Sequence, residues 1–253
     1  LRVPEEINRK IVDHISDINL TYSSIAKDYL INEGLDPDKV ICVGSPMKEV
    51  IKYYLPKIQN SNILINLSLK SNKYFLFSCH REENIDNEEN FLKLFNVIEK
   101  LAEIYKLPII FSVHPRTRLK LEEYKKTFPP LVKLIKPLGF FDYIKLQIES
   151  KVVFSDSGTI TEESSLLNFP ALNIRNTHER PEGMDETTVI MSGLNKSRVI
   201  HSVEIATAHN QSSERLIKPV KDYEADNVSK KILRIIISYT DYVNRTVWHK
   251  DKN

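Results

Sequence analysis

The amino-acid sequence predicts an α/β protein in which a parallel sheet is covered by helices on both faces. From residue 73 onward, short apolar runs alternate with longer segments that repeat apolar residues at helical spacing. Each apolar run has the length of a buried strand and is bounded by a polar turn. Alternation of this kind is typical of crossover units, in which a helix carries the chain back to start the next parallel strand.

The elements expected before residue 73 are short. A proline followed by two glutamates, with apolar residues three to four positions apart, favours a helix at the start of the chain. We expect one helix starting at Pro4, a second over 24–33, and a third that follows Pro46 and runs through Tyr54, with strands over 18–22 and 40–43. A polar stretch over 59–72 then interrupts the pattern.

In the alternating part, strands and helices follow from the same two periodicities. The predicted strands are 74–79, 108–113, 132–135, 152–155 and 171–174. The predicted helices are 89–105, 118–128, 140–148 and 160–168, followed by terminal helices over 225–239 and in the aromatic tail to Trp248.

Composition excludes several classes of function. The net charge of +2, with both signs interspersed, gives no indication of a nucleic-acid partner. No apolar run has the length of a membrane span and no signal peptide is recognisable, so we expect no membrane association and a cytoplasmic location. Cys42 and Cys79 cannot form a disulfide framework and are predicted to be reduced, buried thiols. The histidines lack the spacing of a metal site, so no metal or other cofactor is expected.

The segment Ser155-Asp156-Ser157-Gly158-Thr159 follows an apolar strand and precedes a helix. A glycine turn that opens a helix presents backbone N–H groups and the positive end of the helix dipole, which suits a phosphate. Glu162 and Glu163, one turn later, could accept hydrogen bonds from ribose hydroxyls. The segment also fits a capping box, so by itself it indicates a plain helix start equally well.

Polar groups follow three further predicted strands. His80 and Arg81 follow the first, His114 the second, and the run from Arg175 to Glu182 the last. Ligands of open parallel sheets bind beyond the carboxyl ends of the strands, and arginine and histidine both bind phosphate. Any one of these loops is more often merely solvated, but four at one edge favour a nucleoside diphosphate.

Six motifs occur in order over most of the chain and together resemble those of a known family. They are Pro4-Glu5-Glu6-Ile7-Asn8-Arg9, Gly44-Ser45-Pro46, His80-Arg81-Glu82-Glu83-Asn84, Val113-His114-Pro115, Asp156-Ser157-Gly158 with Glu162-Glu163, and Glu179-Arg180-Pro181-Glu182. This series, from residue 2 to about 208, resembles the non-hydrolysing UDP-N-acetylglucosamine 2-epimerases. Those enzymes have two Rossmann-like halves that face a cleft, the arrangement called GT-B.

The resemblance also implies a domain organisation. Residues 1–43 match the tail of the N-terminal Rossmann-like domain, 44–235 the UDP-binding domain, and 236–253 a C-terminal helix that returns toward the first domain. Most of the family's N-terminal half has no counterpart in this chain, which begins with Leu1 and not with Met. We therefore expect a longer polypeptide, a homodimer when complete, and no turnover by residues 1–253 alone.

The resemblance assigns roles to eleven residues. Glu5 and His80 match functional residues of the reaction, with Glu5 assigned to proton transfer. The substrate-binding residues implied are Arg81, His114, Tyr143, Ser157, Gly158, Thr159, Glu163, Arg180 and Glu182. Within this set, Glu163 matches the glutamate that binds ribose, and Tyr143 would stack on uracil. Without the resemblance, Glu5 is a first-turn glutamate favoured by the helix dipole and Tyr143 a core aromatic.

The family reaction converts UDP-GlcNAc to UDP-ManNAc, a polysaccharide precursor, by elimination and re-addition of UDP. Glu82, Thr159 and Ser164 depart from the common pattern. The runs from Glu82 to Asp86, from Gly44 to Met47 and from Ser155 to Thr159 resemble a branch of capsule and O-antigen enzymes. Some of that branch act on UDP-2-acetamido-2,6-dideoxy-L-talose and form UDP-N-acetyl-L-fucosamine. A GT-B glycosyltransferase and a protein that only binds nucleotide sugars remain as rival interpretations.

Overall fold

A computed structural model describes residues 5–124, 127–177, 179–209, 215 and 217–250, without the side chains of Glu5, Glu82, Glu83, Arg116 and His209. The described chain divides into two compact units. One combines the residues up to Tyr53 with those from Val220 onward, and the other runs from Tyr54 to Pro219.

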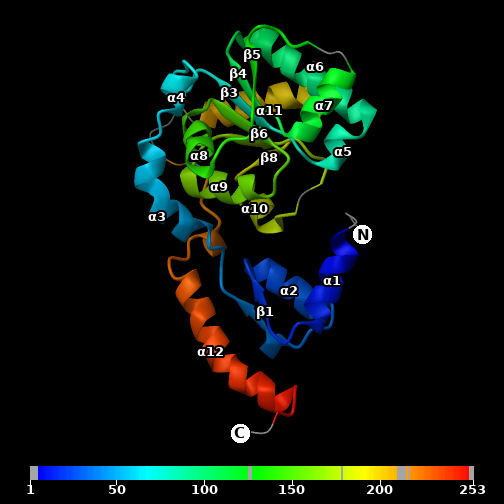
Figure 1. Cartoon of the computed structure of the whole chain (residues 1–253), viewed down its shortest axis with the longest axis vertical. Coiled ribbons are helices and arrows are strands. Elements are labelled where there is room, and N and C mark those ends of the chain that lie inside the picture. Colours follow the sequence, from blue (N-terminus) through cyan, green and yellow to red (C-terminus); the bar gives the residue numbers. More distant parts are fainter. Residues whose placement is uncertain (1–4, 125–126, 178, 210–214, 216, 251–253) are drawn as a thin grey trace. The chain divides into compact units, whose positions relative to one another are not determined.

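The larger unit is built on a six-stranded parallel sheet with the strand order β5-β4-β3-β6-β7-β8 (Figure 1). Its strands are β3 (Phe75–Ser78), β4 (Ile109–Ser112), β5 (Val132–Ile135), β6 (Val152–Ser155), β7 (Ala171–Asn173) and β8 (Ile190–Met191). The strand order reverses direction between β3 and β6, which is where doubly wound sheets bind their ligands. Ser78 pairs with Ser155, so the two central strands end at the same level and their outgoing loops begin side by side.

Alternate residues of these strands enter two separate cores, as the pleat of a strand requires. Phe75 and Phe77 lie in one core, whereas Tyr74 and Leu76 lie in the other. The helices that contribute to the first core are α5 (Glu82–Ile85), α6 (Glu88–Tyr105), α7 (Pro115–Glu123) and α11 (Lys196–His209). Those of the second are α4 (Ile63–Asn66), α8 (Phe140–Glu149) and α9 (Thr159–Leu167). The predicted class, a parallel sheet covered on both faces, is confirmed.

The smaller unit contains a two-stranded parallel sheet and helices from both ends of the chain. Its elements are β1 (Asn19–Thr21), β2 (Val40–Cys42), α1 (Glu5–Ile15), α2 (Ser24–Asn32), the 3₁₀ helices η1 (Pro37–Lys39) and η2 (Lys221–Tyr223), and α12 (Val228–Thr246). Helix α3 (Met47–Gln59) begins in this unit and ends in the larger one. Gly44 has φ +91°, and a Cβ there would lie 2.9 Å from the Asp222 carbonyl oxygen. The Gly44-Ser45-Pro46 motif therefore allows the chain to pass close to η2.

Several elements differ from the predicted ones. Helix α3 continues past Tyr54 because Ile58 is fully buried, and α4 lies inside the stretch expected to be irregular. Helix α7 begins at Pro115, which suits a first helical turn, and ends at Glu123, well before the predicted end at 128. One helix, α12, replaces the two predicted terminal helices.

The structure tests the predictions made for the two cysteines and for membrane-spanning helices. Both cysteines are free, but only Cys79 is buried, so the expectation of a buried thiol is wrong for Cys42. Within the described residues, no helix is both long enough and apolar enough to cross a membrane.

Candidate nucleotide site

The carboxylate of Asp156 lies at the centre of the site. It follows β6, is completely buried, and accepts hydrogen bonds from the backbone N–H groups of His80 (3.0 Å) and Arg81 (2.9 Å). It also accepts from the Cys79 thiol at 3.0 Å and from the Asn84 amide at 3.2 Å. Four donors on one carboxylate hold the loop after β3 against the loop after β6, and each is stronger than a neutral hydrogen bond.

A second carboxylate, Glu179, joins two arginines across the same edge. Arg81 donates to one of its oxygens and Arg175 to the other, both at 3.0 Å. Burial favours the neutral acid, but the hydrogen bonds and charges of Arg175 and Arg81 hold the pKa of Glu179 below its usual value. Arg175 is itself buried, so it serves as a fixed support, whereas Arg81 is partly exposed at 31%.

The polar turn between β6 and α9 has the geometry of a helix start. The Ser157 Oγ lies 3.0 Å from the Thr159 Oγ1 and accepts the Thr159 N–H at 3.4 Å. Gly158 precedes the first helical residue, and a Cβ there would lie 3.4 Å from the Glu179 carboxylate. The first N–H groups of α9 thus open at the carboxyl edge of the sheet, beside the Glu179–Arg81 pair.

Glu162 and Glu163 point to different partners. Glu162 is buried and pairs with Arg180 at 2.9 Å. Glu163 is also buried, and its carboxylate accepts the side-chain N–H of Gln147 at 2.6 Å. Burial raises the pKa of Glu163, while hydrogen bonds from Gln147 and Thr159 oppose this rise. The Glu163 carboxylate is therefore held in place between α8 and α9.

Tyr143 lies one turn before Gln147 on the same face of α8. Desolvation raises the pKa of its hydroxyl, against the hydrogen bonds of Ser78 and Gln147. Because Ser78 ends β3, the phenol is anchored at the carboxyl edge, yet the ring also packs against the second core. The core interpretation and the ligand interpretation of Tyr143 are thus compatible.

The two predicted histidines follow neighbouring strands. His80 has 48% of its side chain exposed, and its Nδ1 lies 3.3 Å from Asp156. His114 follows β4, is exposed, and immediately precedes α7. His80 therefore combines a backbone fixed by Asp156 with an imidazole open to solvent.

Arg180 and Glu182 lie at the start of a short helix, α10 (Pro181–Asp185). Glu182 is buried, and Gly183 beside it packs so closely that a Cβ would meet the Thr161 side chain at 1.9 Å. This contact and the Arg180–Glu162 pair fix α10 against α9.

The structure thus gathers His80, Arg81, Ser157, Gly158 and Thr159 around Asp156 and Glu179, with Tyr143 and Glu163 joined through Gln147. Glu5 begins α1 in the smaller unit, and its side chain lies outside the described residues. Three supporting residues were absent from the predicted set: Glu179, Gln147 and Asp156. The position of Asp156 directly after a strand could have identified it, whereas no sequence signal distinguishes Gln147.

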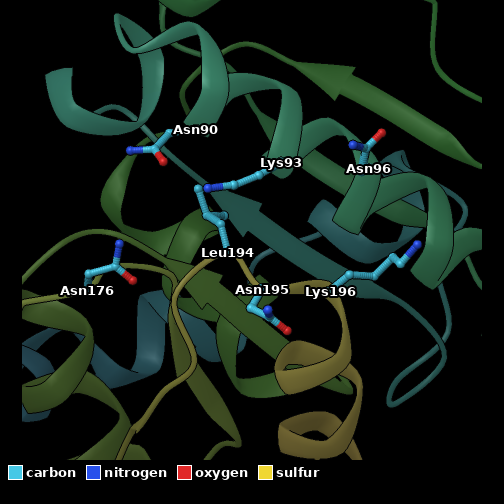
Figure 2. A pocket seen from close by; sticks show the side chains of 7 residues that line it. All are labelled: Asn90, Lys93, Asn96, Asn176, Leu194, Asn195 and Lys196. Carbon is cyan, nitrogen blue, oxygen red and sulfur yellow. The ribbon is translucent and has the colours of Figure 1, made fainter.

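A separate pocket of about 310 Å³ lies between α6 and α11 (Figure 2). It is lined by Asn90, Lys93, Asn96, Asn176, Leu194, Asn195 and Lys196. None of the predicted site residues lines this pocket. Among the described side chains, no group of three or more His, Cys, Asp or Glu residues is arranged to hold a metal ion.

The chain matches a known family model and curated relatives. A family model described as UDP-N-acetylglucosamine 2-epimerase matches residues 1–237. A curated relative, the UDP-N-acetylglucosamine 2-epimerase of Methanocaldococcus jannaschii, is 35% identical over 210 residues, which cover 80% of this chain and 57% of the relative. The chain therefore spans less than two thirds of that relative's length.

Two solved structures extend the likeness to three dimensions. The UDP-N-acetylglucosamine 2-epimerase from Rickettsia bellii is 47% identical with a TM-score of 0.88, and the match covers 98% of this chain and 67% of that one. The Methanocaldococcus jannaschii UDP-GlcNAc 2-epimerase in complex with UDP-GlcNAc and UDP is 32% identical with a TM-score of 0.83, over 93% of this chain and 65% of that one. The expected correspondence to part of a GT-B epimerase structure is confirmed.

Proposed function

This chain belongs to the UDP-N-acetylglucosamine 2-epimerase family, and from that premise we propose that it binds the UDP part of a UDP-N-acetylhexosamine at the carboxyl edge of its six-stranded sheet. The proposal rests mainly on the hydrogen bonds that Asp156 accepts, because they hold the His80-Arg81 loop against the helix start at Gly158. A solved relative was crystallised with UDP-GlcNAc and UDP, which supports the same class of ligand for this chain.

Each part of UDP has a chemical complement at this edge. The first N–H groups of α9 and the guanidinium of Arg81 suit the diphosphate, with no metal required to neutralise it. The carboxylate of Glu163 suits the ribose hydroxyls, and the ring of Tyr143 suits uracil. His114, which follows β4, and Arg180 and Glu182, at the start of α10, are proposed to contact the nucleotide or the sugar.

For the complete protein we propose epimerisation at C2 of the sugar, from UDP-GlcNAc to UDP-ManNAc. A base removes the C2 proton as the C1–O bond breaks, which gives a 2-acetamidoglucal and free UDP. UDP then re-adds at C1 while a proton returns to the opposite face of C2. Because a C2 proton is only weakly acidic, stabilisation of departing UDP must carry much of the barrier.

Within this mechanism the larger unit supplies the leaving-group site. His80 is fixed through its backbone by Asp156 and exposed at its ring, and we propose that it acts on departing UDP. Glu5 is proposed to transfer a proton. The chain spans only part of its relatives, and we propose that residues 1–253 bind UDP without turnover. We further propose that the complete protein is a cytoplasmic homodimer.

One experiment tests the reaction and the substrate together. The complete protein is incubated in deuterated water with UDP-GlcNAc or, separately, with UDP-2-acetamido-2,6-dideoxy-L-talose. Deuterium at C2 supports epimerisation, and the sugar that exchanges identifies the substrate. Sugar transfer to an acceptor without exchange would indicate a glycosyltransferase, and UDP binding without either reaction would indicate a protein that only binds nucleotide sugars.

A further inference from the structure

Gln147 connects two residues that the proposed function assigns to the nucleoside. It lies on α8 one helical turn after Tyr143, and its amide reaches Glu163 on the neighbouring helix α9. Only 1% of the glutamine is exposed, and 7% of the glutamate. The contact is therefore made between two buried polar side chains, where a hydrogen bond has its largest effect on the group it serves.

The side-chain amide of Gln147 has a defined orientation, with its nitrogen toward Glu163. Its Nε2 donates to the Glu163 Oε2 at 2.6 Å, so the carboxylate oxygen is the acceptor in this contact. Its Oε1 is buried and accepts no hydrogen bond within the described part of the chain. A buried amide oxygen without a donor is unfavourable, so the interaction with Glu163 determines which way the amide faces.

Charged and titratable groups face Glu163 from each helix packed around it. On α9 itself, Glu162 repels it and is in turn paired with Arg180, while the Thr159 hydroxyl donates to it. From α8 come the phenol of Tyr143 and the amide of Gln147. No cation within the described structure forms a salt bridge with Glu163, so neutral donors alone oppose the desolvation of its charge.

Ribose hydroxyls need an acceptor at this position. An ionised carboxylate only accepts hydrogen bonds and can take both the 2′- and 3′-hydroxyls, whereas a protonated one loses part of that capacity. We propose that Gln147 is a positioning residue for nucleoside recognition, because its amide N–H holds the Glu163 carboxylate ionised and oriented toward the ribose. This inference rests on the proposed function, since it presumes a ribose at Glu163.

The test compares UDP with 2′-deoxy-UDP by titration calorimetry on the 253-residue chain between pH 6 and 8.5. The parent chain should bind UDP about tenfold or more tightly than the deoxy compound, since a hydrogen bond to a charged group is lost. Gln147→Met keeps the length of the side chain but removes the N–H donor. It should reduce this ratio to about threefold or less, and its UDP affinity should fall at a higher pH than that of the parent.

Two further variants serve as references. Glu163→Gln should remove both the discrimination and the dependence on pH. Lys145→Met lies two residues away on α8, where Lys145 pairs with Glu149, and should keep the parent ratio. Because each ratio is measured on a single variant, a reduced fraction of folded protein does not change it.

The outcomes separate the two proposals. If the parent chain does not bind UDP at any pH, the proposed function fails and this inference fails with it. If the parent discriminates and Gln147→Met keeps both the ratio and the pH midpoint, only the role of Gln147 is overturned. A parent that binds both nucleotides equally would likewise overturn the inference while leaving UDP binding intact.

Discussion

Asn84 donates its side-chain amide to Asp156 at 3.2 Å, although 72 residues separate them in the chain. One belongs to the His80–Asn84 motif and the other to the Asp156–Gly158 motif, so two separate sequence signals form one structural unit. The amide also approaches the Ile174 carbonyl at the end of β7. Three loops at the sheet edge therefore depend on this pair.

Replacement of Asp156 by asparagine should destabilise the larger unit. The new amide would place N–H donors against donors that the buried carboxylate now accepts. We expect a loss of about 2–4 kcal/mol in the free energy of unfolding, measured by urea denaturation. Asp185→Asn, at an exposed position on α10, is the matched control and should change it by less than about 0.5 kcal/mol. An Asp156→Asn variant as stable as the parent would show that the hydrogen bonds accepted by Asp156 contribute little to stability.

Gly183→Ala should separate α10 from α9. A methyl group would lie 1.9 Å from the Thr161 Cγ2, so one of the two helices must move, and we expect a cost of about 1–3 kcal/mol. The Arg180–Glu162 pair should be disturbed with it. Gly139→Ala, where no atom lies within 4 Å of the new Cβ, is the control and should change thermal stability little. Equal melting temperatures for both variants would contradict close packing at Gly183.

Glu179→Gln should alter stability as a function of pH. The folded-state pKa of Glu179 lies below its usual value, so the ionised form stabilises the fold above about pH 4.5 and this contribution is lost as the pH falls through the folded-state pKa. The variant lacks the contribution, which we estimate at about 1 kcal/mol for this partly exposed pair. The difference in free energy of unfolding should be constant above about pH 5.5 and shrink below pH 4.5. A difference that persists unchanged down to pH 3 would exclude this origin.

His80→Ala should abolish C2 deuterium exchange in the complete protein with little loss of stability. The imidazole is half exposed, and its removal leaves the backbone bonds to Asp156 intact. We expect exchange to fall by at least about 100-fold, as for loss of a proton-transferring group. His201→Ala, on the exposed face of α11, is the control for both readouts. Unfolding of His80→Ala would instead assign His80 a structural role.

The sheet was predictable because most of its strands are short runs rich in apolar residues and bounded by turns. Both ends of two strands were predicted correctly, namely Val132–Ile135 and Val152–Ser155. Helix α11 was missed because its apolar residues mark only a narrow stripe, in which Val199 and Val203 enter the core. Strand β8 was missed because it has two residues, and its position follows from pairing with β7 and not from its own composition.

The gathering of motif residues at one edge of the sheet was predictable, but the contacts between them were not. Motif residues such as Arg81 and Glu163 were identified from where they stand relative to strands and helix starts. Their partners were not, because a salt bridge between Arg81 and Glu179 depends on which loops the sheet brings together. Gln147 follows no pattern at all, and only the packing of α8 on α9 reveals its contact.

The pairing of β3 with β6 has a consequence for how the protein is made. The backbone N–H group of His80 meets its acceptor only when Asp156, 76 residues later, has left the ribosome. At roughly 5–20 residues per second, the His80 N–H lacks this acceptor for about 4–15 s during synthesis. Strands β4 and β5 can join β3 in that interval, but parallel pairing over such a separation is slow. The contacts between the loops after β3 and β6 should therefore form late, and a nascent chain stalled before Asp156 should not be protected by UDP.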